Sequence, residues 1–538
     1  MIKTAEAMVK CLEQEGIKVV FGYPGAAICP FYDYLSRSSI RHILVRQEQN
    51  GGHSANGYAR MTNKPAVCIA TSGPGATNLI TAIATAYADS VPLVVITGQV
   101  CVDQIGRDVF QEADITGSAE PFVKHSYLVK DAEQLPKIFK EAFYLAGTGR
   151  KGPVLIDVPM DIQQQEISDF EYPESVDIRA YKPTTKGNSL QIKRVAKALN
   201  EAEKPLICAG GGVFSSDAQS ELYALAEKAK IPVVSTMMGI GALRGEDSLY
   251  FGMIGTHGRK LANKAVQDCD LILMIGARVG DRAVKTPFSL AETTTIVHID
   301  IDPAEIGKNI PTDIPLVGDA KYILTHLIEQ VDGKDNSEWL NSLSAQRVKK
   351  VYEPAQKGFI NPKEFMARLS AKAPENTVLV ADVGQNQIWC CNNFNVKGGR
   401  FLTSGGMGTM GYSLPCGIGA KLASPESLVI SVCGDGAFQM SMMELATLVQ
   451  HNVPVKIILM TNTRLGMVRE LQTKNYADNQ VAVHLDGNPD FIKLADAYGI
   501  ATYRLDSPEN EDMVIDRLIN DKEAFFVECI VSPDESTL

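Results

Sequence analysis

The chain has 538 residues and a formal net charge of −11, and 45% of its residues are hydrophobic. At roughly 100–200 residues per domain, this length predicts about three folded domains. The acidic balance and the lack of a Lys/Arg-rich run argue against binding of nucleic acid or of an anionic membrane.

Eleven cysteines occur without a CxxC spacing, which is typical of reduced thiols and not of a zinc ribbon. No apolar run reaches the ~18–20 residues of a membrane helix. Charges interrupt the N-terminal segment, which argues against a signal peptide. We therefore expect a cytoplasmic protein.

Helix and strand signals alternate along the first 165 residues. Strand-like segments over 17–25, 42–48, 66–78 and 92–99 run into glycine-rich turns or helical stretches. Two further α/β patterns follow a polar linker near 162–190 and a charged, irregular segment near 331–362. The sequence therefore predicts an α/β fold with three doubly wound parallel-sheet domains, over 1–165, 188–332 and 360–538.

The third segment carries the most informative motif. A buried strand ends at Gly434-Asp435-Gly436, and the next strand ends at Asn462, 27 residues after Asp435. This spacing is about one strand–helix–strand unit, so both side chains should lie at the carboxyl edge of one sheet. A carboxylate and an amide oxygen suit Mg²⁺, and the glycines leave room for a diphosphate. The alternative is an ordinary strand-ending turn followed by a helix cap.

This motif resembles the diphosphate–magnesium motif of thiamin diphosphate (ThDP) enzymes. Glu48, in VRQEQNGGHSANGYAR, fits a second requirement of that family, because a carboxylic acid bonded to the aminopyrimidine promotes formation of the cofactor's carbanion. The loop GGMGTMG over 405–411 resembles the family loop under the thiazolium ring, with Met410 holding the cofactor bent. Its formal GxGxxG is weak evidence for a dinucleotide site, because FLTS is a poor preceding strand.

Nearly the whole chain resembles the catalytic subunits of acetohydroxyacid (acetolactate) synthases. Similar stretches include TSGPGATNLITAIATAYADSVPLVVITGQV, RDVFQEADITG and NPDFIKLADAYGI. The resemblance implies a pyrimidine-binding domain (1–165), a central FAD-type domain (188–332) and a diphosphate- and Mg²⁺-binding domain (360–538). It implies that Asp435, Asn462 and Arg464 form the metal site. The ThDP-binding residues that it implies are Pro24, Glu48, Asn78, Gly384, Gln385, Asn386, Gly408, Met410, Gly434, Asp435, Gly436, Ala437, Asn462, Leu465, Gly466 and Met467.

In that family the middle domain binds FAD in a non-redox role. The residues that match its flavin-binding positions are Arg150, Gly210, Gly211, Gly212, Met253, Gly255, Thr256, His257, Gly276, Arg278, Asp300, Ile301 and Asp319. Without the resemblance, these positions are also consistent with ordinary α/β turns.

The implied reaction is the decarboxylation of pyruvate on ThDP and transfer of the two-carbon unit to a second 2-oxo acid. Pyruvate as acceptor gives 2-acetolactate, and 2-oxobutyrate gives 2-aceto-2-hydroxybutyrate, the first common step of branched-chain amino-acid synthesis. The residues implied to act in catalysis are Glu48, Phe110, Gln111, Lys124 and Arg282, of which Arg282 holds the acceptor carboxylate.

The resemblance also implies an assembly. In the family, the residues that match Glu48 and Asp435 come from different chains, so a homodimer is the minimum active unit, and homotetramers occur. A separate small regulatory subunit often joins them.

Several positions depart from the family pattern. Gln47 and Asn386 stand where histidines are common, Met160 replaces a lysine, and Val279-Gly280-Asp281 replaces Phe-Asp-Asp. Leu471 stands where a tryptophan usually favours 2-oxobutyrate over pyruvate, so we expect a weaker preference here.

Three classes of alternative function remain open from the sequence. A catabolic, FAD-independent acetolactate synthase or a flavin-dependent pyruvate oxidase would share the ThDP motifs. A non-catalytic nucleotide-binding protein of the same fold would lack Glu48 or Asp435, and both are present. An FAD- or NAD-dependent oxidoreductase would need a strong strand before Gly406 and an acid about 20 residues later.

Overall fold

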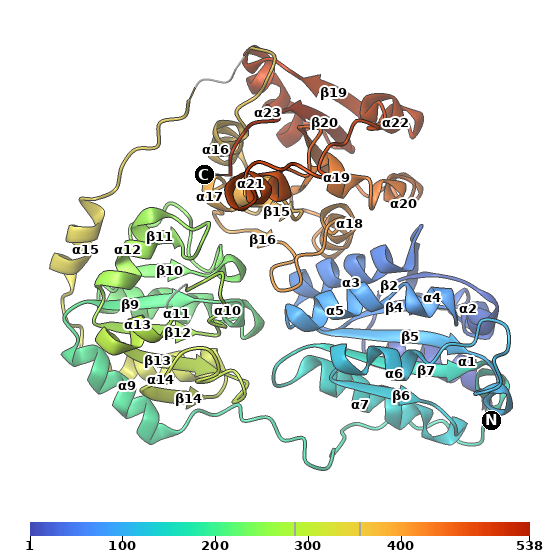
Figure 1. The fold of residues 1–538 in the computed structure, drawn as a ribbon. Helices are drawn as coiled ribbons and strands as arrows, with labels where there is room; N and C mark the ends of the chain where they lie inside the picture. The colour runs from blue at the N-terminus through green and yellow to red at the C-terminus, as the bar shows by residue number, and fades with distance from the viewer. Residues whose placement is uncertain (285–286, 354–356, 538) are drawn as a thin grey trace.

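The computed structural model describes residues 1–284, 287–353 and 357–537. Three six-stranded parallel sheets follow one another along the chain, and helices surround each sheet (Figure 1). Each sheet lies inside one of the three predicted ranges, and the predicted fold class is confirmed. In the part of the chain that is described, no helix has the length and apolar character needed to cross a bilayer.

The first sheet has the strand order β3-β2-β4-β5-β7-β6, so the winding direction changes between β2 and β4. Its strands are β2 (Val19–Tyr23), β3 (Arg41–Leu44), β4 (Ala66–Ala70), β5 (Leu93–Gln99), β6 (His125–Leu128) and β7 (Pro153–Pro159). Its helices are α1 (Thr4–Gln14), α2 (Cys29–Leu35), α3 (Glu48–Thr62), α4 (Pro74–Thr77), α5 (Ile80–Ala88), α6 (Ile115–Ala119), α7 (Leu135–Gly147) and α8 (Met160–Gln164). A short antiparallel pair, β1 (Ile2–Lys3) and β8 (Glu166–Ile167), joins the two ends of this unit.

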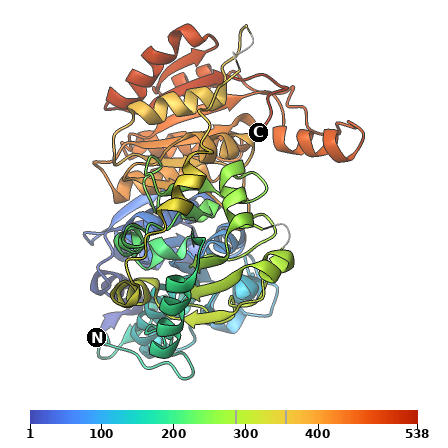
Figure 2. The same ribbon diagram turned by 90° about the vertical axis from the view of Figure 1, so that its left-hand side faces the viewer.

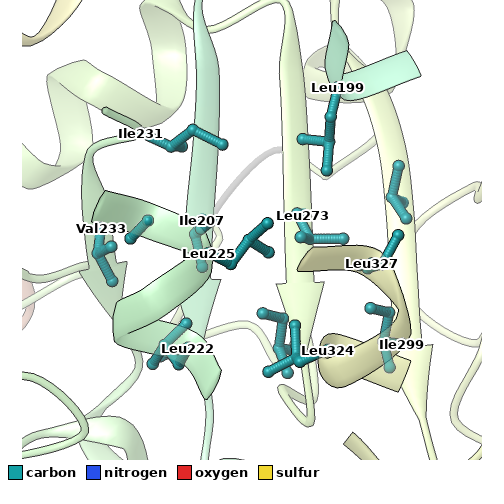
Figure 3. Packing of buried hydrophobic residues seen from close by; sticks show 14 of the residues in the cluster. Leu199, Ile207, Leu222, Leu225, Ile231, Val233, Leu273, Ile299, Leu324 and Leu327 are labelled. Atoms are coloured by element: carbon teal, nitrogen blue, oxygen red, sulfur yellow. The ribbon is translucent and has the colours of Figure 1, made fainter. Parts of the chain in front are cut away.

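The middle sheet has the order β11-β10-β9-β12-β13-β14, and its winding changes between β9 and β12. Leu222 and Leu225 of α11 and Leu324 and Leu327 of α14 pack over β9 and β12 (Figure 3). The strands are β9 (Pro205–Ala209), β10 (Val233–Ser235), β11 (Tyr250–Met253), β12 (Leu271–Ile275), β13 (Thr295–Asp300) and β14 (Ile314–Val317). The helices are α9 (Ser189–Glu201), α10 (Gly212–Ser215), α11 (Gln219–Lys228), α12 (Lys260–Asp268), α13 (Pro287–Thr293), α14 (Ala320–Gln330) and α15 (Ser337–Ser344).

The third sheet has the order β16-β15-β17-β18-β20-β19. Its strands are β15 (Val378–Ala381), β16 (Arg400–Leu402), β17 (Val429–Gly434), β18 (Lys456–Thr461), β19 (Ala501–Leu505) and β20 (Phe525–Ile530). Its helices are α16 (Pro362–Lys372), α17 (Gln385–Asn393), α18 (Ser413–Ala423), α19 (Asp435–Phe438), α20 (Leu445–Gln450), α21 (Gly466–Asn475), α22 (Phe491–Ala497) and α23 (Glu511–Asn520). Figure 2 shows α21, in orange, projecting away from the body of this domain.

Two local expectations were wrong. The segment 331–362 is not wholly irregular, because α15 forms within it and buries Trp339, whose indole N–H donates to the carbonyl of Pro205 (3.1 Å). The FLTS segment was expected to be a poor strand, but Arg400–Leu402 forms strand β16 at the edge of the third sheet. This strand pairs with β15.

The first and third domains meet along helices α3 and α18, which lie side by side in Figure 1. Glycines allow this approach, since a Cβ on Gly57 would collide with the carbonyl of Cys416, and one on Gly419 with the carbonyl of Ser54. The Tyr412 hydroxyl donates across the boundary to Asn56 (2.8 Å). The two domains of one chain are therefore firmly packed together.

Candidate functional site

Three loops converge at the carboxyl edge of the third sheet. The strands β15, β17 and β18 are parallel neighbours, so the residues that follow them lie side by side. Gln385 begins α17 after β15, Asp435 follows β17, and Asn462 follows β18. The sequence-based expectation that Asp435 and Asn462 share one edge agrees with this topology.

Asp435 is held rigidly at this edge. Its side chain is buried, and its Oδ2 accepts hydrogen bonds from the backbone N–H of Thr463 (2.8 Å) and from Nδ2 of Asn488 (2.8 Å). Burial raises the pKa of Asp435 above its ordinary value, and these hydrogen bonds lower it in part. A bound cation would offset the cost of burying the charge. Asn488 begins the NPDFIKLADAYGI stretch, but it was not among the residues predicted to form the site.

Asn462 is oriented by its neighbours. Its Nδ2 donates to Oε1 of Gln385 (2.8 Å), which turns the amide oxygen toward the loop where it accepts from the N–H of Arg464 (3.0 Å). Gln385 is fixed in turn, because its Nε2 donates to Glu470 and to the carbonyl of Glu535 (2.7 Å). The guanidinium of Arg464 donates to the carbonyl of Thr463 (2.8 Å). Because a guanidinium has no acceptor, Arg464 could supply a metal ligand only through its backbone oxygen.

The glycines of this edge let the surrounding side chains pack closely against its backbone. A Cβ on Gly436 would lie 2.7 Å from Leu465 and 3.6 Å from Met410, and one on Gly466 would collide with Gln385. Gly408 has a positive φ of 70°, and the side chain of Met410 is half-buried. The amide group of Asn386 is already engaged within the chain, because its Nδ2 donates to the carbonyls of Asp382 and Val432. The remaining positions expected to bind ThDP at this edge are their chain neighbours Gly384, Gly434, Ala437 and Met467.

A second polar cluster lies at the carboxyl edge of the first sheet. Glu48 is the first residue of α3, and its Oε2 accepts from Nδ2 of Asn78 (3.0 Å). Pro24 follows β2, and a Cβ on the next residue, Gly25, would lie 2.5–2.7 Å from Thr71 after β4. These loops border the position where the winding of the sheet changes, which is where open α/β sheets bind ligands.

Two hydroxyls at this edge point to a polar ligand. Thr71 Oγ1 and Ser72 Oγ are buried and have no hydrogen-bond partner among the described residues. Buried polar atoms are usually satisfied, so an added polar group would stabilise them. Both residues belong to the TSGPG segment, which resembles the family, but neither was predicted to bind the cofactor.

Gln111 and Phe110 lie beside this cluster, and Lys124 does not. A Cβ on Gly73 would lie 2.9 Å from the Cα of Gln111, whose φ of 60° is in the left-handed region, and Phe110 is 86% exposed. Lys124 directly precedes β6, so it lies at the opposite, amino edge of the parallel sheet. Its Nζ donates to the carbonyl of Thr148 (2.8 Å), and burial lowers its pKa to about 8. The structure therefore does not bring Lys124 to Glu48.

The positions expected to bind FAD gather at the carboxyl edge of the middle sheet. Gly210 and Gly276 follow the adjacent strands β9 and β12, where the winding changes, and a Cβ on either glycine would collide with the other loop. Asp300 ends β13, and burial raises its pKa to about 6. The Oδ2 of Asp319 accepts from the Ser216 hydroxyl (2.6 Å). Gly211, Gly212, Met253, Gly255, Thr256, His257, Arg278 and Ile301 lie in or next to loops at this same edge.

Two arginines complete this edge. Arg150 reaches it from the first domain and forms ion pairs with Glu305 (2.8 Å) and Asp302 (3.2 Å). The backbone oxygen of Arg282 accepts from the N–H of Thr256 (2.9 Å), and its side chain is 80% exposed. Arg282 thus lies on the surface beside the loop that follows β11.

Leu471 occupies an exposed face of the projecting helix. It is 52% exposed, and Val468, one turn earlier on α21, is 45% exposed. The adjacent Glu470 points inward, where it accepts from Gln385 and from the N–H of Thr537 (2.8 Å). The helix that carries Leu471 is therefore linked to Asn462 through the side chain of Gln385.

Comparison with known proteins agrees with this division into domains. The chain matches the model of the thiamine pyrophosphate enzyme N-terminal TPP-binding domain over residues 2–118. It matches the central domain of the same enzymes over 192–327 and their C-terminal TPP-binding domain over 382–529.

Full-length relatives are similar over almost the whole chain. A probable acetolactate synthase large subunit of Methanocaldococcus jannaschii is 46% identical, over 99% of this chain and 93% of that protein. The acetolactate synthase large subunit of Buchnera aphidicola is 43% identical, over 93% of this chain and 89% of that protein. The acetolactate synthase large subunit of Haemophilus influenzae is 41% identical, over 94% of this chain and 90% of that protein.

Proposed function

Because the chain belongs to the thiamine pyrophosphate enzymes, among the acetolactate synthase large subunits, we propose that it decarboxylates pyruvate and joins the two-carbon unit to a second 2-oxo acid. The acceptor is pyruvate, which gives 2-acetolactate, or 2-oxobutyrate, which gives 2-aceto-2-hydroxybutyrate. The observation that carries the proposal is the pair of polar edges, one built on Glu48 and one on Asp435 and Asn462.

The residues at these edges fit ThDP and Mg²⁺. A buried carboxylate and an oriented amide oxygen form a donor set for a hard cation. The unpartnered hydroxyls of Thr71 and Ser72 suit the polar ring of the cofactor. When bound, ThDP supplies a nucleophilic carbon that stabilises the charge formed on decarboxylation.

The roles of the chain's own residues follow from their contacts. Glu48 holds a proton at a ring nitrogen, and Asn78 fixes the direction of its carboxyl group. Asp435 and Asn462 would bind Mg²⁺, and Gln385 holds the amide of Asn462 in the required orientation. Gln111 and Phe110 border the space beside Glu48 where the substrate would lie.

We also propose FAD as a structural cofactor of the middle domain. Support comes from the close approach of Gly210 and Gly276 at the change of winding, the position where open α/β sheets bind ligands. Arg150 and Arg282 lie at the same edge, and Arg282 is the candidate to hold the carboxylate of the acceptor.

The relatives' names also suggest a partner. They are called large subunits, which supports a proposal that a small regulatory subunit binds this chain. We further propose a homodimer or homotetramer, because Glu48 and Asp435 lie on separate domains and each forms only half of a ThDP site.

One experiment tests the proposed function. The purified chain receives ThDP, Mg²⁺ and FAD with equal amounts of pyruvate and 2-oxobutyrate, and both acetohydroxy acids are quantified with and without EDTA. We expect both products, and their loss when the metal is removed. Hydrogen peroxide in place of acetohydroxy acids would instead indicate a pyruvate oxidase.

A further inference from the structure

Helix α5 of the first domain contacts the loop of the third domain that carries Met410. This loop runs over 405–411, and its residues 405–408 are exposed to solvent. An exposed loop with four glycines at 405, 406, 408 and 411 has many accessible conformations. Contacts from outside the loop must therefore select one of them.

Asp89, at the C-terminal end of α5, binds the start of the loop. Its Oδ1 accepts from the N–H of Gly406 (2.7 Å), and its Oδ2 accepts from the N–H of Gly405 (3.2 Å). The same Oδ2 forms an ion pair with Arg60 (2.7 Å), and the side chains of Asp89 and Arg60 are 0% and 7% exposed. Because both partners are buried, the carboxylate has one fixed position from which to bind the two amides.

Thr85, one turn earlier on α5, binds the end of the loop. Its Oγ1 lies 2.8 Å from the carbonyl of Thr81 and 2.7 Å from the Oγ1 of Thr409. A hydroxyl has one proton, so Thr85 donates to Thr81 and accepts from Thr409. Thr409 directly precedes Met410.

The loop also lies flat against the helix. A Cβ on Gly406 would lie 2.9 Å from the carbonyl oxygen of Ala88 and 3.0 Å from Oδ1 of Asp89. Only a residue without a side chain allows the amides of the loop to reach Asp89. Two hydrogen-bonding side chains and one close contact thus fix the loop on the same helix.

We propose that helix α5 positions the loop over 405–411, and with it Met410, through Thr85 and Asp89. Both are positioning residues, since neither contacts the Asp435 or Glu48 edge directly in the contacts described above. That Met410 then supports a cofactor rests on the proposed function. The hold of α5 on the loop does not rest on the proposed function, because it follows from contacts within the chain.

The test compares Thr85→Val with Thr85→Ser, which keeps the hydroxyl. A matched control is Thr447→Val, because the Thr447 hydroxyl also lies between the first and third domains, 2.6 Å from Oε2 of Glu444 and 3.1 Å from the carbonyl of Leu44, but outside the loop. Gly406→Ala tests the close contact independently. Two quantities are measured: amide hydrogen exchange of the loop in the protein without added cofactor, and the Kd for ThDP with Mg²⁺ by calorimetry.

We expect Thr85→Val to speed exchange of the loop amides and to raise the Kd by about five-fold, the effect of one lost hydrogen bond. Gly406→Ala should do the same, whereas Thr85→Ser and Thr447→Val should behave as wild type. Unchanged exchange in Thr85→Val and Gly406→Ala, or faster exchange with an unchanged Kd, would overturn the proposal. Wild-type protein that binds no ThDP would refute the proposed function, and the exchange data would still decide whether α5 holds the loop.

Discussion

Glu48 is the residue on which the proposed chemistry depends most. Its carboxyl group is half-buried at the start of α3, and Asn78 fixes its orientation. We predict that Glu48→Gln lowers kcat by about 10²- to 10⁴-fold, because glutamine cannot exchange a proton with the cofactor. Binding of ThDP, measured by calorimetry, should persist, since the diphosphate and Mg²⁺ contacts lie in another domain.

A matched control for this variant is Glu141→Gln. Glu141 is also half-buried in the first domain, but it accepts from the Tyr127 hydroxyl (3.0 Å) on the far side of the domain from Asn78. It should keep wild-type kcat. A Glu48→Gln enzyme with more than a tenth of the wild-type kcat would contradict the assigned role.

Leu471 tests the origin of acceptor specificity. Its side chain is 52% exposed on α21, and we propose that it borders the acceptor. We predict that Leu471→Trp raises the ratio of acetohydroxybutyrate to acetolactate by about ten-fold, because added apolar contact discriminates by ~1–3 kcal/mol. Leu471→Phe should give an intermediate ratio. The competition assay with both substrates measures it, and equal ratios in all three proteins would refute the idea.

Among single residues, the sequence predicted Asp435 and Asn462, which end strands, but it missed residues that act only by supporting them. Asp435 and Asn462 stand at the ends of two adjacent strands, so strand spacing was enough to place them together. Asn488 and Glu470 support them from distant positions, and only the folded chain brings them into contact. Lys124 was grouped with Glu48 on the resemblance alone, but it directly precedes β6 and so lies at the opposite edge of the sheet.

At the scale of elements, the crossing of α3 and α18 determines how the first and third domains pack. We predict that Gly419→Ala lowers the free energy of unfolding by about 1–3 kcal/mol, because the new Cβ would collide with the carbonyl of Ser54. Gly417→Ala is the control on the same helix, where the added Cβ would meet Val455 at 3.4 Å, an ordinary contact. It should be neutral or stabilising by up to about 1 kcal/mol. Urea unfolding of both variants distinguishes the two outcomes.

The pairing of β5 and β7 buries a second carboxylate. Asp157 accepts hydrogen bonds from Thr97 (2.7 Å) and Gln99 (2.9 Å), but burial dominates and raises its pKa to about 7. The unfolded value is about 3.9, so the folded chain binds more protons between these two values. The contribution of Asp157 to stability is therefore greatest in acid and decreases as the pH rises from about 4 to about 7.

We predict that Asp157→Asn removes this contribution. The fall in the free energy of unfolding between about pH 5 and about pH 8 should be smaller in the variant than in the wild type, because asparagine does not ionise. Urea unfolding at both pH values measures the difference. An identical fall in the two proteins would show that Asp157 does not carry the pH dependence.

Most strands could be predicted because strands of parallel sheets, buried on both faces, are near-continuous apolar runs. The failures were short elements whose stability comes from tertiary contacts. α15 forms because Trp339 is buried against the middle domain, and β16 forms because it pairs with β15. Neither contact leaves a local signal in the sequence.

At the scale of the whole molecule, the two polar edges belong to different domains. The first and third domains of one chain are already packed through α3 and α18, and each presents only part of a ThDP site. If the site forms between two chains, Glu48 of one protomer works with Asp435 of its partner. This arrangement would make the dimer a condition for activity.

The most direct test uses mixed dimers. Glu48→Gln and Asp435→Asn chains, each inactive alone, are co-expressed with different tags, and the mixed dimers are isolated. If each site joins two chains, one of the two sites is intact, and about half of the wild-type activity should return. Mixed dimers of wild type with the double variant should then be inactive, because each site carries one defect. Inactive mixed dimers of the single variants, together with activity in the wild-type and double-variant pair, would show instead that Glu48 and Asp435 act within one chain.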